Sequence, residues 1–200
     1  MSFLFVGLGN PGDKYARTRH NAGRLALEYL QKKFEQDFSP WKKAKKPKAI
    51  FSDGVFADQD VTLLLPDNFM NLSGESVKKL VREEADAARV VVVHDEIDLP
   101  LSKMQIAFGK GSGGHNGVQS IIDQIGTKDF IRIRVGVSPM NWFGNIKKPQ
   151  GKEAVTRFLL SDFKKKEQEK LEEIFLDVTS ALEMIVREGK EKTMNHWNEH

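Results

Sequence analysis

A run of four valines, Val90-Val91-Val92-Val93, leads directly into the polar sequence His94-Asp95-Glu96-Ile97-Asp98. An uninterrupted run of β-branched apolar residues is typical of a strand whose two faces are both covered. In open α/β sheets, ligands bind at the edge formed by the carboxyl ends of such strands. We therefore expect the polar residues after the valines to lie at a binding edge.

Strand and helix patterns alternate on both sides of this run. The patterns predict strands at Phe3–Leu8, Ile50–Ala57, Val61–Leu65, Met104–Phe108 and Ile131–Val137, and helices at Asn21–Phe38, Ser73–Ala88, Asn116–Ile125 and Gln168–Glu188. Residues 39–49 and 138–152 are expected to be loops. The alternation predicts one α/β domain over residues 1–200, with a twisted mixed, mainly parallel sheet flanked by helices.

The composition narrows the class of protein. Two hundred residues, 40% of them hydrophobic and 30% charged, are enough for one folded domain with its own core. The absence of cysteine excludes disulfide scaffolds, thiolate metal sites and cysteine nucleophiles. The first residues lack the basic segment of a signal peptide, and no apolar stretch approaches the ~20 residues of a membrane span. We expect a cytosolic protein.

The basic residues gather in two segments. Residues 31–50 hold seven lysines against Glu35 and Asp37, and residues 99–150 hold seven lysines and arginines against Asp123 and Asp129. A single lysine run is usually a solvated surface loop. Two basic segments, one of them containing a glycine-rich loop, favour a phosphate backbone as the partner.

Two glycine-rich stretches are candidates for binding. Gly7-Leu8-Gly9-Asn10-Pro11-Gly12 matches the G-x-G-x-x-G spacing of dinucleotide folds, but the turn-forming Asn-Pro-Gly is not followed by the required helix. A tight turn is therefore the plainer interpretation of this stretch. A nicotinamide-dependent oxidoreductase is kept as an alternative function. The stretch from Gly109 to Gly117 has five glycines in nine residues, which allow a close approach of the backbone to a partner. The helix after it offers free N–H groups to an anion.

Several polar residues are candidates for chemistry. His94, Asp95, Glu96 and Asp98 are residue types that bind metals, but they lack metal-ligand spacing. The favoured interpretation is a hydrogen bond between Asp95 and a histidine elsewhere. His20 lies in a polar loop before a helix that Asn21 can cap. Ser73 lacks the surroundings of a nucleophile and is expected to cap the next helix.

Taken together, these segments resemble the bacterial-type peptidyl-tRNA hydrolase family. The matching motifs are Val6-Gly7-Leu8-Gly9-Asn10-Pro11-Gly12 with Tyr15, Thr18-Arg19-His20-Asn21-Ala22-Gly23, Leu65-Pro66 with Phe69-Met70-Asn71-Leu72-Ser73-Gly74, His94-Asp95-Glu96-Ile97-Asp98-Leu99-Pro100, Gly113-Gly114-His115-Asn116-Gly117 and Arg132-Ile133-Arg134-Val135-Gly136. They follow in the right order and span nearly the whole chain, from Phe3 to about Leu182.

The resemblance implies hydrolysis of the ester that joins a peptide to the 3′ end of tRNA, by a monomer without metal or cofactor. It implies that His20 is the catalytic base and Asp95 its hydrogen-bond partner. Asn10, Asn71 and Asn116 resemble residues that hold the substrate and the attacking water. The resemblance therefore implies that Asn10 and Asn116 are catalytic residues together with His20 and Asp95. Met70 and Tyr15 resemble pocket contacts.

The chemistry of these residue types agrees with the reaction. Ester hydrolysis near neutral pH needs a base whose pKa is near 7, and free histidine has a pKa of about 6.5. A carboxylate on the second ring nitrogen fixes the tautomer and stabilises the imidazolium. Asparagine amides both donate and accept hydrogen bonds, so they can orient a water or bind an oxyanion without carrying charge.

The chain departs from the family in its basic residues. The family usually has lysines between the Leu-Pro motif and the glycine-rich loop, where this chain has Gln105 and Ala107. Lys103, Lys110 and Arg134 are the remaining candidates for phosphate contacts. A non-catalytic RNA-binding relative is the alternative function, and the presence of His20, Asp95 and the three asparagines argues against it.

Overall fold

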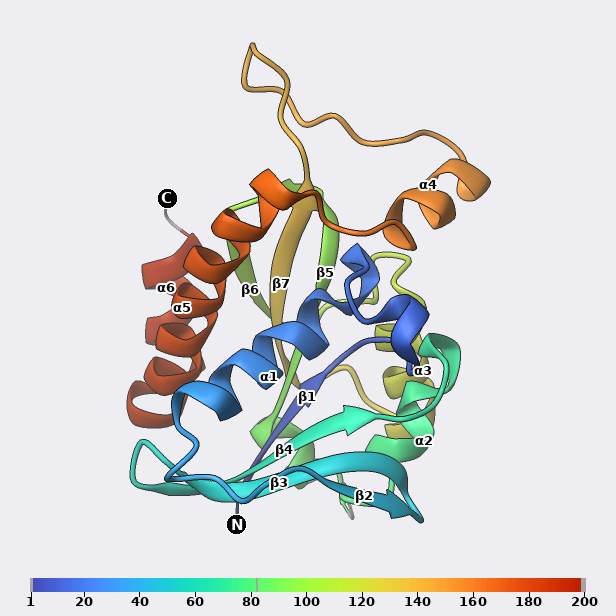
Figure 1. Cartoon of the computed structure of the whole chain (residues 1–200). Coiled ribbons are helices and arrows are strands. Elements are labelled where there is room, and N and C mark those ends of the chain that lie inside the picture. The colour runs from blue at the N-terminus through green and yellow to red at the C-terminus, as the bar shows by residue number, and fades with distance from the viewer. Residues whose placement is uncertain (1, 82, 199–200) are drawn as a thin grey trace.

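The valine run lies inside strand β5, between β1 and β7, in the computed structural model, which describes residues 2–81 and 83–198 (Figure 1). The described residues form one seven-stranded sheet with the strand order β2-β3-β4-β1-β5-β7-β6. The strands are β1 (Phe3–Gly7), β2 (Lys42–Lys45), β3 (Lys48–Phe56), β4 (Gln59–Pro66), β5 (Val90–Pro100), β6 (Met104–Phe108) and β7 (Ile131–Ser138). Strand β5 therefore continues well past the four valines, through the polar residues after them.

The pairing of the strands divides the sheet into a parallel centre and antiparallel edges. Strands β4, β1, β5 and β7 form the parallel centre, paired in that order. The pairs β2–β3, β3–β4 and β6–β7 are antiparallel. The predicted α/β class and mixed sheet are confirmed, and the carboxyl ends of β1, β5 and β7 meet at one edge.

Helices cover both faces of the sheet (Figure 1). The helices are α1 (Ala22–Lys33), α2 (Ser73–Val77), α3 (Asn116–Ile125), α4 (Lys152–Leu159), α5 (Lys165–Glu188) and α6 (Lys190–Asn198). One buried cluster joins α1 and α5 to the sheet face that carries Phe5, Val91 and Val93. A second cluster joins α2 and α3 to the opposite face, which carries Val6 and Val92. This two-sided burial is the reason for the unbroken valine run.

The lysine-rich segment is a strand, so the predicted loop at residues 39–49 is wrong. Strand β2 pairs with the start of β3, and its lysines are exposed at the edge of the sheet. Lys43 forms an ion pair of 2.8 Å with Asp67. Lysines on an edge strand discourage further strand pairing, and their charge hides the alternation that predicts a strand.

Two predicted helices are too long. Helix α2 ends at Val77 rather than Ala88, and a separate 3₁₀ turn spans Glu84–Arg89. That turn begins with a capping box between Glu83 and Asp86, which starts a new element in the middle of the predicted helix. Arg82, inside the same range, lies outside the described residues. The first helix ends at Lys33, because the chain turns so that Phe38 can pair with Gly54 of β3.

Residues 138–152 are largely without regular structure, as predicted, up to the start of α4. The sequence patterns do not predict helices α4 and α6, since α4 is only eight residues long and α6 has few apolar residues. Across residues 2–81 and 83–198, none of the helices has the length and apolar character that crossing a membrane requires.

Candidate active site

Asp95 is held at the carboxyl edge of the sheet by the strand that contains the valines. It is the second residue after Val93 and is 3% exposed. Its backbone pairs with Val135 of β7, so the neighbouring strand fixes its position. Its carboxylate is the centre of the candidate site.

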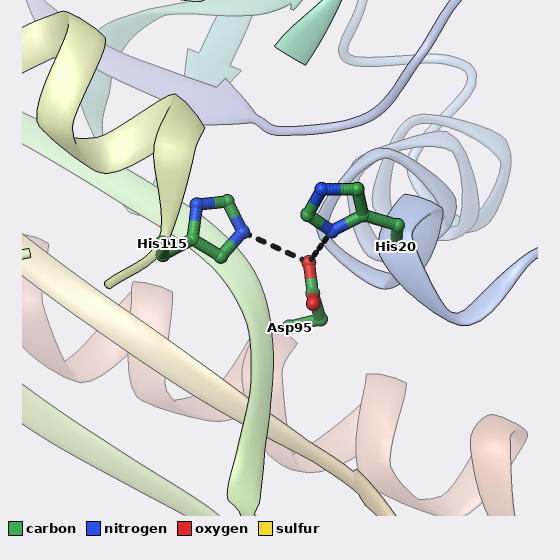
Figure 2. Close-up of side chains that lie close together, drawn as sticks. All are labelled: His20, Asp95 and His115. Carbon is green, nitrogen blue, oxygen red and sulfur yellow. Dashed lines mark hydrogen bonds and ion pairs between the residues drawn. The ribbon is translucent and has the colours of Figure 1, made fainter. Parts of the chain in front are cut away.

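His20 reaches Asp95 because helix α1 begins directly against β5. A Cβ atom on Gly23 would lie 2.0 Å from the carbonyl oxygen of Val93, so only glycine permits this approach. The 3₁₀ turn Arg19–Asn21 immediately before the helix carries the imidazole to the strand end. His20 Nδ1 lies 2.9 Å from Asp95 Oδ1 (Figure 2). The hydrogen bond between Asp95 and a distant histidine, expected from the sequence, is present.

A second histidine binds the same oxygen. His115 Nε2 lies 2.9 Å from Asp95 Oδ1, on the side opposite His20 (Figure 2). His115 is the N-cap of α3, and its Nδ1 accepts hydrogen bonds from the N–H groups of Gly117 and Val118 at 3.2 and 3.3 Å. Since Nδ1 accepts, Nε2 carries the hydrogen and donates it to Asp95.

The sequence motifs include His115 but do not indicate its role. A signal exists in its position immediately before a strongly patterned helix, where a capping side chain is expected. That signal indicates a cap but does not identify Asp95 as the partner, because the two residues are twenty positions apart.

The pKa values of His20, Asp95 and His94 all depart from their ordinary values. Burial lowers the pKa of His20, but the charge of Asp95 and the hydrogen bond to it outweigh burial and raise that pKa above its ordinary value. Burial raises the pKa of Asp95, yet the two histidines hold it well below the usual range of a carboxyl. Burial, with His115 and Arg132 nearby, lowers the pKa of His94 well below its ordinary value. Asp95 is therefore ionised and His94 neutral around pH 7.

The side chains of His94, Asp95, Glu96 and Asp98, considered above as metal ligands, do not point to a common site. His94 Nδ1 donates to the backbone oxygen of Asp95 at 2.8 Å. Glu96 forms an ion pair with Arg134, and Asp98 forms one with Lys148.

Another potential ligand set consists of His20, Asp95 and His115, whose candidate ligand atoms lie within 4.8 Å of one another. However, His115 Nε2 carries a hydrogen as long as Nδ1 accepts from the helix. The donor set therefore fits a hydrogen-bond network rather than a cation.

A cleft of about 780 Å³ opens beside His20. Its polar lining consists of Asn10, His20, Asn71, His115, Asn116, Lys152 and Thr156. Its apolar lining consists of Phe69, Met70, Val155, Leu159 and Leu160. One wall therefore comes from α4 and the residue after it, an element that the sequence does not predict. The cleft brings together five of the residues assigned from the sequence: Asn10, His20, Met70, Asn71 and Asn116.

Helix α4 is fixed to the turn that carries His20. The backbone N–H of Arg19 donates to the carbonyl of Ser161, and that of Phe163 donates to the carbonyl of Arg17. The guanidinium of Arg19 forms an ion pair of 2.7 Å with Glu167 and lies against two phenylalanine rings. The side chain of Arg19 thus holds this wall of the cleft against the turn that carries His20.

Asn10 is positioned by its neighbours with one amide group left over. Its Oδ1 accepts from the backbone N–H of Met70 at 2.9 Å. Asn21, which was expected to cap α1, instead exchanges two hydrogen bonds with the backbone of Asn10 at 2.8 and 3.0 Å. Within the described parts of the chain, no group binds Asn10 Nδ2, so this donor is available to a ligand.

Ser73 is neither a helix cap nor a nucleophile. It is the first residue of α2, fully buried, and its hydroxyl donates to the carbonyl of Met70 at 2.8 Å. A Cβ on Gly117 would lie 2.4 Å from Met70 Sδ. Met70 is therefore held between the start of α2 and the start of α3.

The remaining predicted contacts lie outside the cleft lining. Tyr15 is half-buried against Lys14 rather than in the cleft. Lys103 lies with Asp177 at a small cavity on the face covered by α5 and α6. Arg134 donates hydrogen bonds to Glu96 and to Gln105. The guanidinium that was expected to contact phosphate is therefore already bound by the protein. Lys110, in the glycine-rich loop, is exposed and makes no ion pair with any described residue.

Comparisons with known proteins extend over the whole chain. The family model Peptidyl-tRNA hydrolase matches residues 4–200. A peptidyl-tRNA hydrolase from Thermodesulfovibrio yellowstonii is 38% identical over 98% of both chains. One from Fervidobacterium nodosum is 40% identical over 98% of this chain and 95% of its own. The crystal structure of peptidyl-tRNA hydrolase from Acinetobacter baumannii matches with a TM-score of 0.85 and 33% identity, over 98% of this chain and 94% of that one.

Proposed function

The chain belongs to the peptidyl-tRNA hydrolase family and hydrolyses the ester between a peptide and the 3′ end of tRNA, and we propose that His20 is the base that activates water for this reaction. The single observation that carries the proposal is the hydrogen bond of 2.9 Å between His20 Nδ1 and buried Asp95, at the side of the cleft. With Nδ1–H donated to the carboxylate, Nε2 holds the lone pair.

The proposed reaction has two steps. Water attacks the ester carbonyl carbon while its proton passes to His20 Nε2, and a tetrahedral intermediate forms. The intermediate then breaks the bond to the 3′ oxygen of tRNA, which takes the proton back from the imidazolium. The products are free tRNA and a peptide with a carboxyl end. Asp95 stabilises the imidazolium through its charge and does not itself need to take a proton.

We assign the two cleft asparagines to the charge and the water. Asn10 Nδ2 is the donor left over by the hydrogen bond from Met70 to Oδ1. Asn116 is exposed in the cleft lining at the first turn of α3, so its amide can donate to the developing oxyanion. Asn71 lines the same cleft and is proposed to hold the substrate with Met70.

We assign His115 a positioning role. It donates to Asp95 and accepts from the first N–H groups of α3, so it connects the carboxylate to the helix that carries Asn116. Such a connection fixes both the carboxylate and the oxyanion donor relative to His20. We propose that the protein acts as a monomer, as the resemblance to the family implies. The substrate of the proposed reaction arises in translation, which supports a cytoplasmic location.

The proposal is tested by turnover of an N-blocked aminoacyl-tRNA. The wild-type protein should release free tRNA without added metal, and His20→Ala should lose activity by at least about 10²-fold, in the range for a general base. Binding of the tRNA without turnover by the wild type would indicate the non-catalytic RNA-binding alternative. Full activity of His20→Ala would contradict the assignment of the base.

A further inference from the structure

Two large aromatic side chains project into solvent between β7 and α4. Trp142 is 97% exposed and Phe143 is 85% exposed. The segment that carries them extends away from the body of the protein, above the end of β7 (Figure 1). Single exposed apolar residues are common on protein surfaces. Two adjacent aromatic rings at the tip of a projection are not explained by packing and indicate a contact surface.

The tip is a hydrogen-bonded turn. Met140 and Ile146 pair as an antiparallel bridge at its base. The backbone N–H of Asn141 donates to the carbonyl of Asn145 at 2.8 Å. Asn141 Oδ1 accepts from the N–H groups of Phe143 and Asn145, both at 2.9 Å. The turn therefore engages its polar side chain in internal hydrogen bonds and leaves the two rings outside.

The same segment is connected to the catalytic cleft. Lys148, near the end of the loop, forms an ion pair with Asp98 of β5. The chain then enters α4, whose residues Lys152, Val155 and Thr156 line the cleft beside His20. The aromatic tip and one wall of the cleft are thus parts of one continuous stretch of chain.

The charge around this stretch favours a nucleic acid over other partners. Besides Lys148, which is paired with Asp98, residues 139–160 carry Lys147, Lys152 and Arg157 against Glu153 alone. Exposed aromatic rings next to basic side chains are the features that bind unpaired nucleotides, because bases stack on the rings and phosphates meet the cations.

Resting on the proposed function, we propose that Trp142 and Phe143 form a stacking platform for unpaired nucleotides near the 3′ end of the tRNA substrate. The terminal nucleotide has to enter the cleft for its ester to reach His20. The nucleotides before it lie outside the cleft, and the chain that forms the α4 wall leads through residues 147–151 to the aromatic tip (Figure 1). The platform adds binding to the tRNA without touching the reacting atoms.

The direct test uses the fluorescence of Trp142. The chain has three tryptophans, so Trp41→Phe with Trp197→Phe leaves Trp142 as the only one. The probes are two unesterified stem-loop RNAs, one with an unpaired 3′ overhang and one with a blunt end. The overhang RNA should quench the fluorescence saturably and the blunt RNA should not. Equal effects of both RNAs, or a blue shift with anionic phospholipid vesicles and no response to RNA, would overturn the proposal.

A second measurement does not depend on the single-tryptophan protein. Trp142→Ala with Phe143→Ala should bind the overhang RNA about 5- to 150-fold less tightly for each stacking interaction removed. Its KM for N-blocked aminoacyl-tRNA should rise while kcat stays unchanged. Leu176→Ala, which removes a partly exposed apolar side chain from α5, is the matched control and should change neither. An unchanged KM and RNA affinity in the double variant would contradict the platform.

The two proposals fail separately. RNA binding by the unesterified probes requires no hydrolysis, so a full turnover rate in His20→Ala would remove the proposed base and leave the platform standing. Normal loss of activity in His20→Ala, with no difference between the overhang and blunt RNAs, would remove the platform alone.

Discussion

His20 and His115 lie on two sides of one carboxylate oxygen, each at 2.9 Å, and the difference between them is in the other ring nitrogen. The second nitrogen of His115 accepts from two N–H groups of α3. The second nitrogen of His20 has no partner among the described residues, and the ring lines the cleft. The two histidines therefore lie at equal distances from the shared acceptor but in different surroundings. The His20 ring keeps one nitrogen free, whereas helix α3 fixes the His115 ring.

The comparison also supports the proposed division between a residue that moves a proton and a residue that holds the site in place. Both ring nitrogens of His115 are engaged by the protein, which suits a positioning residue. His20 keeps one nitrogen for the substrate and has a pKa raised by Asp95, which suits a base that must bind and release a proton. The following predictions test this division, from the largest expected effect to the smallest.

Asp95→Asn should have a large effect, no greater than that of His20→Ala, because it removes the acceptor that both histidines share. We expect kcat/KM to fall by roughly 10² to 10⁴-fold. The base works only when neutral, so activity falls on the acid side as pH drops through the His20 pKa. Removing the charge that raises this pKa leaves burial, which lowers it, so the acid limb should move to lower pH. A pH series of kcat/KM measures both effects, and an unmoved limb would contradict the pairing.

The double variant His20→Ala with Asp95→Asn should be little worse than His20→Ala alone. On the proposed function the two residues act as a unit, so the second change should remove an interaction that the first has already abolished. Single-turnover rates of the two single variants and the double variant give the coupling directly. Additive effects would show that Asp95 acts independently of His20.

Asn116→Ala should cost about 2.7–4 kcal/mol in the barrier of the chemical step if its amide binds the oxyanion. The effect should appear in kcat, because the charge develops only after substrate is bound. Asn71→Ala, in the same cleft lining, is the comparison and should raise KM instead. A change confined to KM in Asn116→Ala would make it a binding residue.

His115→Ala should reduce activity less than His20→Ala, and it should not move the acid limb to lower pH, since Asp95 keeps its charge. The helix is deprived of its cap, so the free energy of unfolding should fall by about 0.5–2 kcal/mol. His115→Asn restores a capping side chain and should recover stability in a denaturant titration. An acid limb that moves as in Asp95→Asn would contradict the contrast between the two histidines.

Lys110→Ala should have the smallest effect, a rise in KM with kcat unchanged. Its exposed charge makes no ion pair with any described residue, so it remains available to phosphate. The log–log slope of KM against salt concentration should become shallower by about 0.7 to 0.9 for each phosphate that the lysine neutralises. Lys103→Ala, on the face of α5 and α6, should leave the slope unchanged. Equal effects of the two changes would place the RNA elsewhere.

Much of the fold is predictable because its signals are local. The valine run, the hairpin of β3 and β4, and helix α3 follow from side-chain periodicity over a few residues. The wrong predictions arise where one local pattern masks another. The lysines of β2 hide the alternation of an edge strand, and the capping box at Glu83 divides a segment that apolar spacing alone predicts to be one helix. Helix α4 spans only eight residues, which is too short a pattern to predict the wall of the cleft.

The sequence by itself determined the family, the residue types at the site and the strand ends that bear them. The tertiary structure decided which atoms meet. His20, Asp95 and His115 come from three separate elements, and their shared hydrogen bonds depend on how closely α1 and α3 approach the sheet. The pairing of Arg134 with Glu96 likewise arises between neighbouring strands. Periodicity records which face of an element is buried, whereas a distance of 2.9 Å between side chains depends on the packing of elements far apart in the chain.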